Sequence, residues 1–210
     1  MTFVSLNTEA THEAGGRVAG VTTAKVVRND DPQGLGRVKL SLAWREDSFE
    51  TDWTRVVAPM AGSGRGTFFL PEVGDEVLVA FDRDDIRYPY VLGGLWSQTD
   101  LPPERNQPHK NDIRVLRSRK GHVVVFDDGD KGKVTIALND GKTIEIDDDG
   151  IRITDLTNTI EMKSAAGTVK ISAGQQLSLE APQISISAQT KLELKGGGDL
   201  SASAGMVRIN

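Results

Sequence analysis

The carboxylates best placed for acid-base chemistry stand close together in the second half of the chain, at Glu145, Asp147, Asp148 and Asp149. Glycoside hydrolases work with two carboxyl groups a short distance apart, and clustered carboxylate oxygens also bind calcium. Gly150 follows directly, and Asp-Asp-Asp-Gly between two apolar stretches is typical of a solvated turn. The glycine-rich nonapeptide of calcium-binding β-rolls is not repeated around it. We therefore favour a turn over a hydrolytic or calcium site.

Two further segments carry residue types used in catalysis or phosphate binding. His122 with Asp127 or Asp128 is half of a hydrolase triad, but no serine motif accompanies it, so a histidine at the start of a strand is the simpler interpretation. The Gly62-Ser63-Gly64-Arg65-Gly66 segment lacks the Lys-Ser/Thr pair and the following helix of a P-loop, and it predicts a flexible loop. We predict no catalytic residue, no metal ligand and no cofactor.

Aromatic side chains in the first hundred residues are candidates for stacking on nucleic-acid bases, namely Trp53, Phe68 and Phe69. The arginines of this region are offset by neighbouring Asp and Glu residues. Between Asp127 and Glu161, ten acidic residues stand against four basic ones, and this excess repels a phosphate backbone. We therefore predict no nucleic-acid partner and expect the three aromatic side chains to pack in a core.

The composition also excludes several classes of protein. The chain has no cysteine, which rules out disulfides and thiolate catalysis and fits a protein made in a reducing cytoplasm. The N-terminal residues do not read as a signal peptide, and no run of apolar residues is long enough to span a membrane.

A short repeat dominates the last third of the chain. Apolar-x-apolar pairs recur at intervals of about eight residues on average, which is too short for a helical repeat and right for a strand plus a turn. The pairs are Val134 and Ile136, Ile144 and Ile146, Ile151 and Ile153, Ile160 and Met162, Val169 and Ile171, Leu177 and Leu179, Ile184 and Ile186, Leu192 and Leu194, and Val207 and Ile209, with Leu200 alone before the last.

So short a repeat cannot wind around a single-chain solenoid, because eight extended residues including a turn do not travel around a coil and return. A chain can instead zigzag along an axis and form one wall of a prism. Three walls make the smallest closed prism, and closure leaves no exposed strand edge. The absence of aromatic residues after Phe126 fits so thin a core. The predicted trimer core is Ile144, Ile146, Ile151, Ile153, Ile160, Met162, Val169, Ile171, Leu177, Leu179, Ile184, Ile186, Leu192 and Leu194.

The first hundred residues predict a different architecture. They contain five or six short apolar-alternating runs separated by turn-forming residues, which is the strand count of a small Greek-key barrel such as the OB-fold. The runs Val18–Val27 and Gly36–Leu42 are expected to form a hairpin. Prolines and few apolar residues mark the stretch that follows as a linker. We thus expect a flexible arm (1–16), an OB-fold barrel (17–97), a linker (98–120) and a trimeric β-helix (121–210).

Four ordered motifs resemble the OB-fold domain of contractile-injection spikes, the group that includes phage baseplate assembly protein V, VgrG proteins and R-type pyocin spikes. They are Asp31-Pro32-Gln33-Gly34-Leu35-Gly36-Arg37-Val38-Lys39, Trp53-Thr54-Arg55-Val56, Pro71-Glu72-Val73-Gly74-Asp75-Glu76-Val77-Leu78-Val79-Ala80-Phe81 and Pro89-Tyr90-Val91-Leu92-Gly93. Ser118–His122 and Phe126–Asp128 resemble the start of the spike's β-helix. The resemblance implies an all-β homotrimer, an OB-fold barrel followed by a triple-stranded intertwined β-helix.

The resemblance also implies a non-enzymatic function and a set of partners. The chain would be the central spike of a phage tail, a pyocin or an extracellular injection system, and would contact the target membrane only transiently. Because few residues precede the barrel, the hub is expected to be a separate protein, and an inner tube or effector cargo is a further expected partner. A His-x-His metal-binding apex is absent, so a PAAR-type tip protein is expected on Met206, Val207, Arg208, Ile209 and Asn210.

Two interpretations from other classes stay open at this point. One is a β-helix protein that binds or degrades polysaccharide, which would need aromatic sugar platforms on the repeat. The other is an OB-fold protein that binds nucleic acid, which would need a basic barrel face.

Overall fold

The computed structural model describes residues 18–45, 49–106 and 110–208. The chain divides into two compact units, residues 1–105 and 106–210. Both are built from β-strands, and the only helical element among the described residues is the short 3-10 turn η1 (Asp82–Asp84). In the described part of the chain no helix is long and apolar enough to cross a membrane. The expected arm, residues 1–16, lies outside the described residues.

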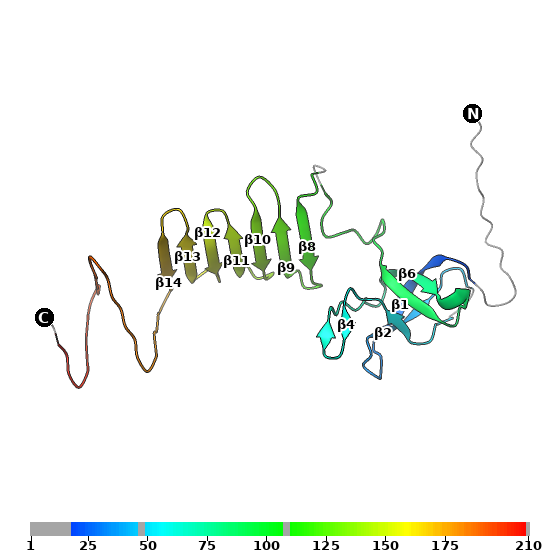
Figure 1. The fold of residues 1–210 in the computed structure, drawn as a ribbon, viewed down its shortest axis with the longest axis horizontal. Coiled ribbons are helices and arrows are strands. Elements are labelled where there is room, and N and C mark those ends of the chain that lie inside the picture. The colour runs from blue at the N-terminus through cyan, green and yellow to red at the C-terminus, as the bar shows by residue number, and fades with distance from the viewer. Residues whose placement is uncertain (1–17, 46–48, 107–109, 209–210) are drawn as a thin grey trace, which may run out of the picture. The chain divides into compact units, whose positions relative to one another are not determined.

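Five strands of the first unit close into a barrel in the order β1-β2-β3-β7-β6, drawn in blue to green in Figure 1. All neighbours pair antiparallel except β3 and β7, which are parallel. The predicted small barrel and its first hairpin are thereby confirmed. The barrel strands are β1 (Val21–Arg28), β2 (Arg37–Ser41), β3 (Thr54–Val56), β6 (Glu76–Phe81) and β7 (Pro89–Gly94).

The barrel core follows from the alternation of side chains along its strands. Val38 and Leu40 of β2 and Val77 and Val79 of β6 point inward and are fully buried, because every second residue of a strand faces the same side. Ten apolar side chains are buried in this cluster, which lies entirely in the first unit. The barrel therefore has a hydrophobic core supplied by a single chain.

One carboxylate organises the connection between β1 and β2. Asp31 accepts hydrogen bonds from the backbone N–H groups of Gln33 and Leu35 and from the Nε and Nη2 atoms of Arg37, the latter two at 2.8 Å. Its side chain is only 3% exposed. These donors, with the Arg37 guanidinium as the largest cause, hold the pKa of Asp31 well below its ordinary value. The spacing of Asp31 and Arg37 in the sequence thus fixes the shape of the loop.

A short hairpin, β4 (Ala61–Gly62) paired with β5 (Arg65–Gly66), lies between β3 and β6 in the sequence. Gly66 has a φ of +148°, and a Cβ atom there would lie 2.5 Å from the carbonyl oxygen of Met60. Glycine is therefore required at this position. The glycine-rich segment forms an antiparallel hairpin where a flexible loop was expected.

The expected core packing of Phe68 and Phe69 is wrong. Their side chains are 77% and 71% exposed, because the β4–β5 hairpin leads the chain outside the barrel wall, and only Leu70 packs partly against the core. Trp53 is half-buried on the barrel surface, where the Arg28 guanidinium and the Lys39 ammonium lie 5.3 and 5.7 Å from its ring centroid. These contacts are cation–π interactions, so two charged side chains lie over the Trp53 ring.

The second unit contains one antiparallel sheet of seven strands in strict sequence order, side by side in Figure 1. Each strand pairs with the next along the chain, so the chain zigzags as the repeat predicts. The strands are β8 (Ile113–Arg117), β9 (Val123–Asp127), β10 (Lys133–Ala137), β11 (Thr143–Asp147), β12 (Gly150–Thr154), β13 (Thr159–Lys163) and β14 (Thr168–Ser172).

Two expectations for this unit need correction. The expected linker, residues 98–120, contains strand β8, whose five residues follow the prolines and pair along their whole length with β9. The strands expected after Ser172 are not formed in the described residues 173–208. The Gly174 N–H group donates to the Asn158 side chain at 3.0 Å, but no strand among the described residues pairs with this extended stretch.

Candidate interface on the seven-stranded sheet

The strand register places two rows of apolar side chains on one face of the sheet. In an antiparallel sheet, directly paired residues point to the same side, and residues two apart along a strand share that side. The first row is Leu116, Val124, Ile136, Ile144, Ile153, Ile160 and Ile171, and the second is Phe126, Val134, Ile146, Ile151, Met162 and Val169, with Arg114 in line at the β8 end. We call these two rows the apolar face.

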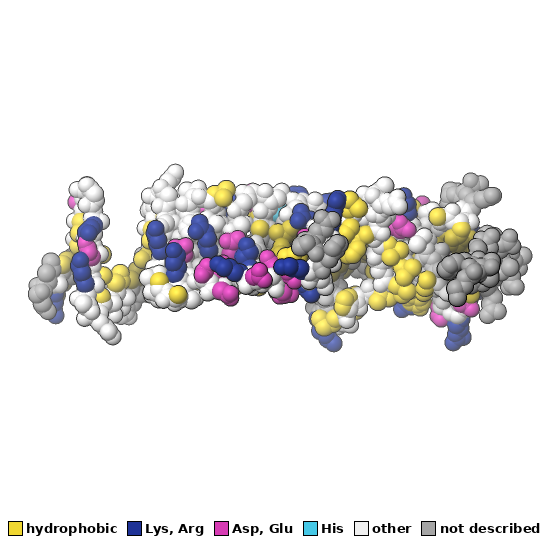
Figure 2. Space-filling view, turned by 90° about the horizontal axis from the view of Figure 1, so that it is seen from above, with side chains coloured by type: hydrophobic (Ala, Val, Ile, Leu, Met, Phe, Trp, Pro, Cys, Tyr) yellow, Lys and Arg dark blue, Asp and Glu magenta, His cyan; other side chains and the backbone are white. Residues whose placement is uncertain are grey.

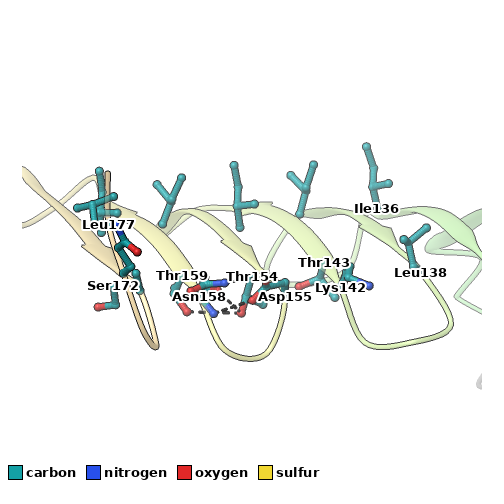
Figure 3. A pocket seen from close by; sticks show the side chains of 16 residues that line it. Ile136, Leu138, Lys142, Thr143, Thr154, Asp155, Asn158, Thr159, Ser172 and Leu177 are labelled. Atoms are coloured by element: carbon teal, nitrogen blue, oxygen red, sulfur yellow. Dashed lines mark hydrogen bonds between the residues drawn. The ribbon is translucent and has the colours of Figure 1, made fainter. Parts of the chain in front are cut away.

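The apolar face is not covered within the chain. No described residue of the second unit is buried, and many members of the two rows are substantially exposed, from 37% at Ile144 to 68% at Val169. A groove of about 610 Å³ runs along the first row, and Figure 3 shows Ile136 on one side of the sheet and Thr143, Thr154 and Thr159 on the other. An exposed apolar surface of this extent marks an interaction site.

The opposite face of the sheet is charged and self-compensating. Its central row runs Glu145, Arg152, Glu161 and Lys170 on successive strands, so opposite charges alternate. The Arg152 Nη1 atom lies 3.7 Å from Glu161 Oε1. In the space-filling view, acidic and basic side chains gather along the strands of this unit (Figure 2). One face of the sheet is thus suited to water and the other to contact with protein.

The three aspartates of the candidate acid cluster lie at the turn between β11 and β12, while Glu145 lies within β11. The Asp147 Oδ1 atom accepts hydrogen bonds from the backbone N–H groups of Asp149 and Gly150, at 2.9 and 3.0 Å, in the short connection between β11 and β12. Gly150 has a φ of +151°, and a Cβ atom there would lie 1.8 Å from the Met162 carbonyl oxygen. Within the described residues no group of three or more His, Asp or Glu side chains could hold a metal ion.

The same turn chemistry recurs at other strand ends. The carboxylate of Asp155 accepts from the backbone N–H groups of Thr157 and Asn158 and from the Asn158 side chain, and these bonds lower the pKa of Asp155. The Asp127 carboxylate accepts from the Gly129 N–H group in the turn after β9. The aspartates that suggested chemistry in the sequence are the residues that close the hairpins.

His122 also has a structural role. Its Nδ1 atom accepts a hydrogen bond from the backbone N–H group of Asn139, which ties the β8–β9 turn to the β10–β11 turn. His122 directly precedes β9, and Asp127 ends that strand. The two side chains therefore stand at opposite ends of the strand and do not form a dyad.

The sheet brings together only part of the predicted trimer core. The apolar face contains eight of its members, and it also contains five residues absent from the prediction, although Val123–Phe126 is plainly strand-forming. The eight are Ile144, Ile146, Ile151, Ile153, Ile160, Met162, Val169 and Ile171, and the five are Leu116, Val124, Phe126, Val134 and Ile136.

The other six members of the predicted core lie beyond the sheet, in the extended stretch where the expected strands are not formed. All six side chains are half exposed or more, from 50% at Ile184 to 65% at Leu194, so none is a core residue within the single chain. The six are Leu177, Leu179, Ile184, Ile186, Leu192 and Leu194. The physical reason is that this stretch has no strand of the same chain beside it, and a core made with other copies stays a prediction.

The predicted tip-binding residues are only partly described. Met206, Val207 and Arg208 are exposed, while Ile209 and Asn210 lie outside the described residues. Their contact with a tip protein stays a prediction.

Two family models match consecutive parts of the chain. The type VI secretion system/phage-baseplate injector OB domain matches residues 22–96, which contain all of the barrel except its first residue, Val21. The phage baseplate V C-terminal trimerisation domain matches residues 114–193, which contain nearly all of the sheet and part of the extended stretch. The second model therefore continues past the last strand that a single chain forms.

Several curated relatives are spike proteins. The type VI secretion system spike protein VgrG2a of Pseudomonas aeruginosa is 37% identical over 79 residues, which are 36% of this chain and 9% of VgrG2a. The type VI spike protein VgrG3 of Vibrio cholerae is 34% identical over 113 residues, which are 49% of this chain and 11% of VgrG3. The actin cross-linking toxin VgrG1 of Vibrio cholerae is 34% identical over 87 residues, 40% of this chain and 8% of the toxin.

The chain thus spans about a tenth of the length of these relatives. The fold of this chain is all-β, with a closed five-stranded barrel in one unit and a sheet with one uncovered face in the other. With both structural units matched by models from one group, the chain belongs to the family of phage baseplate V and VgrG-like spike proteins.

Proposed function

We propose that three copies of this chain form the central spike of a contractile injection apparatus and that the spike works mechanically, without catalysis. The observation that carries the proposal is the apolar face, two rows of side chains that no part of the chain covers. Residues 114–193, which carry the apolar face, match a trimerisation domain. This match supports three as the number of copies that cover the apolar face.

Three sheets around a common axis would turn each apolar face inward and each charged face outward. Completing the burial of a half-exposed isoleucine stabilises the assembly by about 1–2 kcal/mol, at roughly 25 cal/mol per Å² of apolar surface. The two rows repeat this contribution along the whole sheet in every copy. Since the described part of the second unit has no buried residue of its own, its folding and its assembly would be one event.

The extended stretch after Ser172 supports an intertwined continuation of the trimer. Its bends fall at residues 174–175, 182, 189–190, 197–198 and 205, which continues the repeat at seven to eight residues. Each straight segment between bends carries one apolar pair or the lone Leu200, and Figure 1 shows the chain swinging to and fro without a strand beside it. Backbone groups need partners when buried, so strands of the two other copies would pair with these segments.

Such a shaft would transmit force. A closed β-prism whose hydrogen bonds link all three copies resists bending, and separating one wall requires breaking its contacts with the others. Charged side chains on its surface are engaged in turns and in cross-strand pairs at Asp147 and at Arg152 with Glu161. A non-enzymatic function agrees with this arrangement and with the relatives that are named spike proteins.

The partners follow from the place of a spike in the particle. A separate hub protein would bind at the barrel end and a PAAR-type tip protein at Met206–Asn210, with an inner tube or effector cargo as a further partner. The protein would be assembled in the bacterial cytoplasm and carried in a phage tail or injection particle, and it would touch the target membrane only during injection.

Native mass measurement of the purified chain tests the proposal most directly. We expect a trimer with no detectable monomer, and a stable folded monomer would overturn the proposal. Ile184→Asp should abolish the trimer, because it would place three carboxylates together on the axis. Ser185→Asp is the matched control, since neighbouring residues of an extended segment face opposite sides, and it should leave the trimer intact.

A further inference from the structure

A second uncovered apolar surface lies on the barrel. Leu35, Val57, Met60, Phe68 and Phe69 are each more than half exposed, and the latter four belong to the segment that contains the β4–β5 hairpin. Leu35 comes from the loop held by Asp31. The two segments contact each other, since a Cβ atom on Gly36 would lie 3.2 Å from Cε2 of Phe68. We call these five residues the barrel-loop patch.

The barrel-loop patch has the composition of an interface centre. It surrounds a hollow of about 550 Å³, and among the described residues that line this hollow Arg65 alone is charged. The Arg65 guanidinium folds back over Gly62, where a Cβ atom would lie 2.9 Å from Cζ. The five side chains expose on the order of 500 Å², about 300 Å² of it from the two phenylalanines. Adjacent aromatic side chains with few charges are typical of interface cores.

We propose that the barrel-loop patch packs against the same region of the neighbouring copies in the trimer, so that the three barrels also associate with one another. This inference rests on the proposed trimeric spike. The trimerisation-domain match begins at residue 114, and the last barrel strand ends at Gly94, so three barrels would be held on tethers of about twenty residues. Such tethering gives an effective concentration in the millimolar range.

Charge and size favour another copy over a separate protein. Rotational symmetry brings identical groups together, so a highly charged surface repels its copies. The barrel-loop patch carries little charge, since Arg65 is the one charged residue among the described residues that line its hollow. The exposed area of the patch is smaller than the roughly 800 Å² per partner that a stable interface between separate proteins buries. A contact of this size is sufficient between barrels that are already tethered.

Cysteine cross-linking tests this contact, because the chain has no native cysteine. Thr67→Cys places a thiol beside Phe68 on an exposed residue, and Asp52→Cys places one on an exposed residue of the same barrel outside the patch. With a short bis-maleimide at low protein concentration, we expect Thr67→Cys to form covalently linked copies within the native trimer. Asp52→Cys should stay largely unlinked.

A second variant separates this inference from the proposed function. Phe68→Ser combined with Phe69→Ser changes two exposed side chains, so the barrel should fold, and in the Thr67→Cys background it should reduce cross-linking severalfold while native mass still shows a trimer. A trimer in which Thr67→Cys links no better than Asp52→Cys overturns the barrel contact and leaves the spike proposal standing. A monomeric native mass overturns both.

Discussion

The barrel and the sheet are built from strands of similar length and similar alternation, yet only the barrel hides its apolar side chains. The barrel contains all ten buried apolar residues of the core, and the described part of the sheet unit contains none. The difference is topological. The parallel contact of β3 with β7 closes the barrel on itself, whereas each strand of the sheet pairs only with its sequence neighbours, so the sheet stays open. Closure within one chain gives a core, and its absence gives an interface.

The largest effect is expected from charging the apolar face. Ile144→Lys would place an ammonium from each copy at the centre of the trimer, where an unpaired buried charge costs about 3–5 kcal/mol. We expect the trimer to be lost by native mass and the strand signal of the sheet unit to fall in circular dichroism.

The neighbouring residue provides the control for this experiment. Thr143 lies on the same strand as Ile144 and points to the charged face, so Thr143→Lys should leave the trimer unchanged. Equal behaviour of the two variants would show that the apolar face is not the side on which the copies meet.

A change in the barrel core should destabilise the barrel and spare the trimer, the reverse of what is expected for the apolar face. Leu40 is fully buried, and Leu40→Ala is expected to destabilise the barrel by about 2–5 kcal/mol through lost burial and a cavity. The trimer should persist, since Leu40 lies in the other unit. Tryptophan fluorescence reports this unfolding selectively, because Trp44, Trp53 and Trp96 all precede residue 106. Loss of the trimer in Leu40→Ala would mean that the barrel, and not the sheet unit, holds the copies together.

The sequence predicts the alternation in both units but not where each chain finds its partner strands. The pairs from Val134 to Ile171 could be recognised because the spacing is regular and a strand has only two sides. The same spacing continues at Ile184 and Ile186, yet there no strand forms in one chain. Whether a repeat pairs with itself or with a copy depends on turn geometry and on the number of chains, and neither is encoded in the period.

Other failures of prediction have local physical causes. Phe68 and Phe69 were expected in the core because aromatic residues in a short chain usually are, but the β4–β5 hairpin carries them outside the barrel wall. The proline-rich stretch before β8 obscured the alternation of that strand, whose members Arg114 and Leu116 face the same side as the apolar rows. The turn at residues 147–150 could be recognised because Asp-Asp-Asp-Gly between two apolar runs favours a turn, whereas the turn that Asp155 closes carries no such run of turn-forming residues.

A glycine substitution tests the tight packing between strands of the sheet. In Gly150→Ala the new Cβ atom would collide with the Met162 carbonyl oxygen, and the backbone would also be strained at φ +151°. We expect a loss of about 1–3 kcal/mol in stability, visible as a lower melting temperature of the sheet unit. Gly167→Ala is the comparison, because Gly167 has a φ of +61° and nothing lies within 4 Å of its would-be Cβ. A loss at Gly167 as large as at Gly150 would mean that φ alone, not contact with β13, sets the cost.

The smallest effect is expected from acid titration of the loop that holds Leu35 beside the barrel. The pKa of Asp31 lies below its ordinary value of 3.8 in the folded chain, so ionised Asp31 stabilises the barrel above about pH 4, and this stabilisation fades as the pH falls through the folded-state pKa. Asp31→Asn should lower the melting temperature of the barrel at pH 7 and make it less sensitive to acid between about pH 4 and 2. Asp30→Asn removes a solvent-exposed ion pair with Arg28. It should change the melting temperature of the barrel and its sensitivity to acid less than Asp31→Asn does, because water screens that pair. If tryptophan fluorescence shows wild type and Asp31→Asn losing stability in parallel below about pH 4, the acid-sensitive contact of the barrel lies elsewhere than at Asp31 and Arg37.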